Sequence, residues 1–90
     1  MNVNNPLIMK DGYAPAVLVA HRLNKSLSTI HRMVRSGRVE GANDGRALYV
    51  KVSSLVTYYE DSDNPSMTVI AKALDKECRS IAAKLMNGNT

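Results

Sequence analysis

The sequence predicts a mainly α-helical protein with a small β-hairpin and a further helix at its C-terminal end. Apolar residues recur at helical spacing in four segments, which indicates four helices. Between the second and the third of these, Asn43-Asp44-Gly45 separates two short segments and is a strong signal for a hairpin turn. The 90 residues include no Trp and no Phe, so they form one modest aliphatic core that a partner subunit or a ligand could extend.

Residues 1–12 are expected to form an extended N-terminal arm. Its apolar patch, Leu7-Ile8-Met9, either lies on the domain or forms a short strand. The first helix is expected to begin near Pro15, because the N–H that proline lacks needs no partner in the first turn. Its inward positions are Ala16, Val19, Ala20 and Leu23.

The second helix is expected from Leu27 to Ser36, after a turn at Asn24-Lys25. Ser26 can cap it by accepting a hydrogen bond from a backbone N–H, and Ser28 could do so if the helix starts later. Helical periodicity places Leu27, Ile30, Met33 and Val34 on the inner side, Ser28, Arg32 and Arg35 on the outer side, and Thr29 and His31 on the flanks. The outer side has no carboxylate, whereas a surface helix without a binding role usually mixes both signs of charge. This pattern favours a binding face, and the alternative is an ordinary solvated face.

Gly37 can end this helix with a positive φ, and a hairpin of residues 38–42 and 46–50 is expected to follow. Arg46 lies beside the turn, so this small wing would carry a cation at its tip. The alternative is a hairpin that only completes the core.

A third helix is expected from Leu55 to about Asp61, capped by Ser53 or Ser54. Its Tyr58 and Tyr59 are expected to pack at the edge of the core, because no Arg or Lys is interleaved with them as in a base-stacking platform.

Residues 61–66 form the clearest linker of the chain, and an amphipathic helix is expected over 67–87. Its apolar seam has the a/d spacing of a coiled coil and consists of Met67, Ala71, Leu74, Cys78, Ile81 and Leu85. The seam must be buried, either in a homo-oligomer or by folding back on the first domain. Homo-oligomerisation is slightly favoured.

The charge distribution points to a polyanionic partner. The whole chain has a net charge of +4, and residues 20–51 alone combine seven cations with two carboxylates, a net charge of +5. The excess therefore lies on the segment with the basic helix.

Several classes of function are disfavoured. The sequence contains no Ser-His-acid grouping, glycine-rich phosphate loop or paired carboxylate motif, so we do not expect an enzyme. Cys78 is a single cysteine, and His21 and His31 lack ligand spacing, so neither a metal nor a cofactor is expected. The longest apolar run, residues 14–20, is too short to cross a bilayer, and a cytoplasmic protein is expected.

Part of the chain resembles the MerR/excisionase-like winged helix-turn-helix family. The resemblance is carried by Ala20-His21-Arg22-Leu23-Asn24-Lys25-Ser26, by Ser28-Thr29-Ile30-His31-Arg32-Met33-Val34-Arg35-Ser36-Gly37-Arg38-Val39, and by Leu48-Tyr49-Val50 with Ser53-Ser54-Leu55. It covers about residues 13–60, and Arg35-Ser36-Gly37-Arg38 is its strongest element. Lys25 departs from the family, which usually has an aliphatic residue there, so Leu27 is expected to supply that packing.

The resemblance implies a winged helix-turn-helix domain over residues 13–60 of a small DNA-binding protein. Such a protein would come from a phage or mobile element and act as an excisionase-like recombination directionality factor, or it would be a small transcriptional regulator. A recombinase or another protein on DNA is then a possible partner. Phage small terminase subunits use a similar N-terminal module followed by an oligomerising helix, and that layout is the alternative within the same class.

We therefore expect double-stranded DNA to contact the second helix in its major groove. The expected contact residues are Lys25, Ser26, Ser28, Thr29, His31, Arg32, Arg35, Arg38 and Arg46. A dimer through the C-terminal seam would present two modules to half-sites ~34 Å apart. The rival from another class is a protein-interaction adaptor whose basic face docks on an acidic protein surface.

Overall fold

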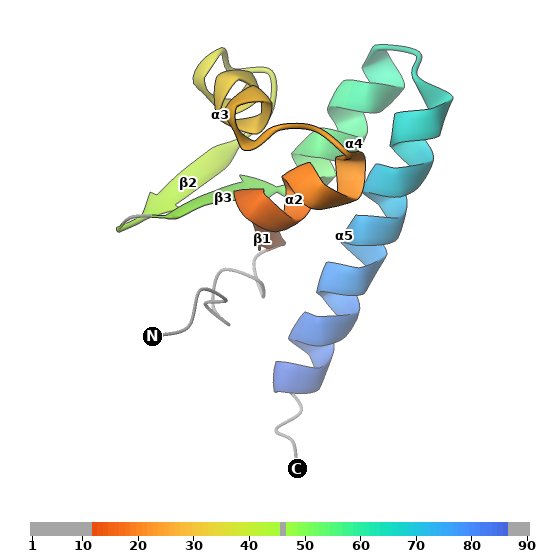
Figure 1. The fold of residues 1–90 in the computed structure, drawn as a ribbon. Helices are drawn as coiled ribbons and strands as arrows, with labels where there is room; N and C mark the ends of the chain where they lie inside the picture. The colour runs from red at the N-terminus through yellow and green to blue at the C-terminus, as the bar shows by residue number, and fades with distance from the viewer. Residues whose placement is uncertain (1–11, 46, 87–90) are drawn as a thin grey trace.

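The computed structural model describes residues 12–45 and 47–86, with side chains up to residue 81. The expected N-terminal arm, apart from Gly12, and the expected wing cation Arg46 lie outside the described residues. In chain order the elements are β1 (Tyr13–Pro15), α2 (Ala16–Leu23), α3 (Leu27–Arg35), β2 (Gly41–Asp44), β3 (Ala47–Lys51), α4 (Val52–Asp61) and α5 (Pro65–Met86). The protein is thus mainly helical, as predicted, with a small antiparallel sheet (Figure 1).

The sheet has three strands in the order β1-β3-β2, one more than the predicted hairpin. The additional strand β1 pairs with β3, so that Ala14 lies opposite Val50. Three residues are too few to show an alternating pattern, so periodicity could not predict this strand. Pro15 is compatible with it because β1 is an edge strand and needs no donor on its outer side.

The junction between α2 and α3 follows the predicted pattern. Asn24 adopts the left-handed conformation, with φ of 56°, and ends α2. Ser26 then caps α3, because its hydroxyl accepts a hydrogen bond from the Thr29 N–H at 3.2 Å. Gly37 follows α3 with a φ of 81°, a value that glycine adopts without steric cost.

The hairpin is shorter than predicted. Strand β2 begins at Gly41, so the prediction of a strand from residue 38 is wrong for residues 38–40. These three residues instead lead the chain out of α3, and Val39 is buried in the core. Asp44 lies opposite Ala47, which places the turn at the predicted glycine.

The two C-terminal helices both start earlier than predicted. α4 begins at Val52, directly after β3, and its N-cap is Lys51, so neither Ser53 nor Ser54 caps it. The Ser54 hydroxyl instead accepts a hydrogen bond from the Glu40 N–H at 2.8 Å. The linker predicted over 61–66 is also too long, because α4 ends at Asp61 and α5 starts at Pro65.

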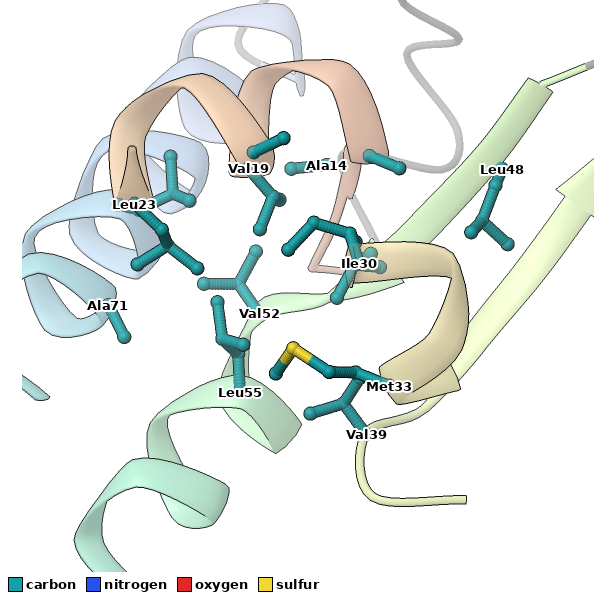
Figure 2. Close-up of a cluster of buried hydrophobic side chains, with 14 of the residues drawn as sticks. Ala14, Val19, Leu23, Ile30, Met33, Val39, Leu48, Val52, Leu55 and Ala71 are labelled. Atoms are coloured by element: carbon teal, nitrogen blue, oxygen red, sulfur yellow. The ribbon is translucent and has the colours of Figure 1, made fainter. Parts of the chain in front are cut away.

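The core lies where α2, α3, β3 and α4 meet (Figure 2). In the close-up, Val19 and Leu23 come from α2, Ile30 and Met33 from α3, and Val52 and Leu55 from α4. Ala71 joins them from α5. Burial of these aliphatic side chains is the main force that holds the short helices in place. Tyr59 is also buried and its ring packs on Tyr58 at a centroid distance of 5.0 Å, which confirms the predicted packing role.

α5 folds back along α4 and α2 (Figure 1). Three residues of the predicted seam, Ala71, Leu74 and Cys78, are buried within the chain, and Met67 packs against the core from a half-buried position. The structure therefore shows the fold-back alternative for this part of the seam, and homo-oligomerisation stays a prediction. The side chain of Leu85 lies outside the described part of the chain.

Gly41 lets the hairpin approach α3 closely, and we predict that Gly41→Ala is destabilising. A Cβ atom at this position would lie 2.8 Å from Cγ1 of Val34 and 3.0 Å from the Tyr49 carbonyl oxygen. Overpacking of this kind costs about 1–3 kcal/mol, which thermal unfolding would measure. Adding Val34→Ala should recover part of the loss, because it removes one of the two obstacles. An unchanged unfolding midpoint in Gly41→Ala would contradict this close packing.

An ion pair links α2 to α5. The Arg22 guanidinium donates two hydrogen bonds to the Glu77 carboxylate, Nη1 to Oε1 at 2.6 Å and Nη2 to Oε2 at 2.8 Å. These hydrogen bonds lower the pKa of Glu77 below its ordinary value.

We predict that this pair makes part of the stability depend on pH. A carboxyl with a lowered pKa in the folded state contributes stability above its unfolded pKa of about 4.3, and this contribution is lost as the pH falls through the folded value. The difference in unfolding free energy between wild type and Glu77→Gln should therefore be largest near neutral pH and shrink in acid. Urea unfolding between about pH 7 and pH 2 would measure it. A difference that is the same at every pH would contradict the assignment.

Candidate nucleic-acid interface

α3 presents two different sides. Ile30 and Met33 are buried against the core, while Ser28, Arg32 and Arg35 are exposed, as the periodicity predicted. In Figure 1, α3 lies above the β2–β3 hairpin, away from α5. The helix therefore has an open outer side on which the predicted contact residues lie.

The cations of this side form no ion pair with carboxylates of the described residues. The ion pairs among the described residues are Arg22–Glu77, Lys51–Glu40, Lys72–Glu60 and Arg79–Asp75. Lys25, Arg32, Arg35 and Arg38 are all exposed, and none of them belongs to these pairs. Because no carboxylate of the described chain holds these groups, they can pair with an external anion without first breaking an internal contact.

The hydroxyl groups before and within α3 have a structural role. Ser26 Oγ accepts the capping hydrogen bond from Thr29 N–H and also lies 2.8 Å from Thr29 Oγ1 and 3.2 Å from Ser28 Oγ. Ser26 thus caps α3, as the sequence predicts, and the DNA contact predicted for it stays a prediction. Thr29 and His31 are half-buried on the flanks, as predicted.

The Leu27 side chain is more exposed than the sequence pattern predicts. Periodicity placed it on the inner side, with a packing role in the turn, yet it is 41% exposed while Ile30 on the inner side is 1% exposed. Leu27 is the first residue of α3, where the helix has just left the turn. Its apolar side chain is therefore part of the outer surface, a feature that the sequence pattern missed.

A second polar surface lies next to Arg38. It is an open hollow lined by Arg38, Glu40, Lys51, Ser53, Ser54, Thr57, Tyr58 and Asp61. Here both signs of charge occur, and Lys51 pairs with Glu40 at 3.5 Å. An ordinary solvated surface mixes both signs of charge, as this hollow does, whereas the outer side of α3 carries cations without carboxylates.

The side chains of Cys78 and Tyr59 are buried. Burial raises the pKa of the Cys78 thiol and that of the Tyr59 hydroxyl. Among the described residues, no three His, Cys, Asp or Glu side chains group together as a metal site would require. No described helix combines the length and apolar character needed to span a bilayer.

The structure thus brings Lys25, Ser28, Arg32, Arg35 and Arg38 onto one helix and its two ends, while Arg46 lies outside the described residues. Comparison of the chain with protein-family models, curated proteins and solved structures gives no match. The functional argument therefore depends on the geometry and charge of this surface.

Proposed function

We propose that the protein binds double-stranded DNA in a sequence-specific manner through a winged helix-turn-helix formed by residues 13–60. The observation that carries this proposal is the outer side of α3, where Arg32 and Arg35 are exposed and belong to none of the ion pairs among the described residues. An α-helix fits the major groove of B-DNA, and arginine is the residue that most often recognises guanine there.

The local architecture supports the proposal. Two short helices, α2 and α3, are joined by a three-residue turn, and the second is capped at Ser26. The β2–β3 hairpin lies next to α3, as a wing does beside a recognition helix (Figure 1). The hydrophobic contacts of Ile30 and Met33 with the core hold α3 rigidly enough to present its outer side.

The expected mechanism divides the contacts into two kinds. Lys25 before α3 and Arg38 after it bind phosphates on either side of the groove and set the position of the protein. Arg32 and Arg35 face the base edges, where a bidentate contact to O6 and N7 of guanine supplies sequence preference. His31 on the flank adds a backbone contact.

The motif around Arg35-Ser36-Gly37-Arg38 favours an excisionase-like directionality factor or a small transcriptional regulator as the cellular role. A terminase-like protein would require α5 to assemble subunits, whereas the seam residues Ala71, Leu74 and Cys78 are buried within one chain. The excisionase-like or regulatory role is therefore the proposal.

Selection of bound sequences from a random duplex pool, followed by a salt titration, tests this function. We expect one enriched motif, and we expect affinity to fall steeply with salt because phosphate contacts release counterions. Random duplex should compete weakly. If no motif is enriched and an acidic protein surface competes better than duplex DNA, the protein is an adaptor and the proposal is wrong.

A further inference from the structure

Leu27 is an apolar side chain on an otherwise polar and cationic surface. Three large apolar side chains are exposed among the described residues, namely Val17 on α2, Leu27 on α3 and Val69 on α5. Leu27 is the one that lies on the proposed DNA-binding helix, directly after the cap residue Ser26. In a DNA complex, the group that complements this side chain would be apolar.

Helix geometry aligns Leu27 with the flank residue His31 and the outer residue Arg35. Residues four apart are neighbours on a helix surface, so Leu27, His31 and Arg35 form one row, and Ser28 and Arg32 form the row beside it. At ~1.5 Å per residue, Leu27 and Arg35 are ~12 Å apart along the axis, roughly the length of three to four base pairs. If α3 lies in the major groove, this spacing places Leu27 and Arg35 at different bases of the same site.

The major groove offers one apolar group for such a side chain. Base edges present donors and acceptors there, and the exception is the C5-methyl group of thymine. Recognition helices contact base edges with their N-terminal residues, and Leu27 is at the N-terminal end of α3. Contact between the Leu27 side chain and a thymine methyl removes two apolar surfaces from water, whereas contact with a phosphate would offer Leu27 no complementary group.

We infer that Leu27 is a specificity-determining residue that reads a thymine through its methyl group, an inference that rests on the proposed DNA binding by α3. The thymine lies within about four base pairs of the guanine that Arg35 recognises, given the spacing along α3. Leu27 thus selects for thymine against the other three bases, which lack a methyl group at this place.

The test uses the full chain and the duplex selected from the random pool. Each thymine of the site is replaced singly by uracil, which removes the methyl group and keeps the base pair. We expect one replacement to weaken wild-type binding about fourfold, the value of one buried methyl-sized group. Leu27→Ala should bind the thymine and the uracil duplex equally, while the control Val69→Ala, with its exposed side chain on α5, keeps the fourfold preference.

Each other outcome overturns the inference. It is overturned if no thymine lies within reach of the guanine, if wild type is indifferent to every uracil, or if Leu27→Ala keeps the preference. In these cases the proposed function still stands, provided that the Arg32 and Arg35 variants lose affinity for the site. If the chain binds no duplex at all, both the inference and the proposed function fail.

Discussion

Replacing Arg32 or Arg35 with alanine is expected to weaken binding to the selected duplex by about 1–3 kcal/mol for each variant. Both side chains are exposed on α3, and neither belongs to the ion pairs among the described residues, so the fold should tolerate the change. If one of them makes a bidentate contact with guanine, its variant should also lose preference at one base pair. Fluorescence anisotropy with the cognate duplex and with single-base variants would measure both effects.

Arg79→Ala is the matched control for these variants. It removes the same charge, but Arg79 lies on α5 and pairs with Asp75 of the same helix at 3.1 Å. Affinity for the duplex should change little, because the site on α3 stays intact. If Arg79→Ala weakens binding as much as Arg32→Ala and Arg35→Ala, the effect follows net charge and α3 is not the recognition helix.

Leu74→Ala is expected to destabilise the protein by about 2–5 kcal/mol, a large part of the stability of a small domain. Leu74 is 1% exposed and lies in the part of α5 that packs against α4 and α2. Truncation leaves a cavity in the core that Leu74 shares with the other buried residues. Chemical unfolding followed by circular dichroism would measure the loss.

Val69→Ala is the control on the same helix. Because Val69 is 68% exposed, this substitution should change the free energy of unfolding little. The same experiment distinguishes fold-back from assembly. If α5 folds back within one chain, the unfolding midpoint of the wild type does not depend on protein concentration, whereas a dimer held by the seam becomes more stable as concentration rises. Equal stability of the Leu74 and Val69 variants would contradict the fold-back packing.

Local signals in the sequence were sufficient to predict α2, α3 and the turn between them. Ser26 is a capping residue, Gly37 permits a positive φ, and Ile30 with Met33 marks the buried side of α3. Each of these features depends on neighbours within a few residues, so the pattern along the chain contains the information. The same holds for the outer arginines of the site.

Features that depend on distant parts of the chain were predicted less well. β1 exists because Ala14 finds Val50 across the sheet, and Leu27 is 41% exposed at the first residue of α3. The seam of α5 shows that a helix needs a partner, but the a/d spacing is the same for a second subunit and for α4. Ser54 bonds to Glu40 rather than capping α4, since the strand β3 continues directly into that helix.

The central claim is that the outer side of α3 lies against nucleotides. A titration of the selected duplex into the isotope-labelled full chain, followed by backbone amide NMR, tests it most directly. We predict that the largest shifts fall on residues 25–38 and that α5 changes little. Shifts that centre on α4 and α5, with the amides of α3 unchanged, would contradict it.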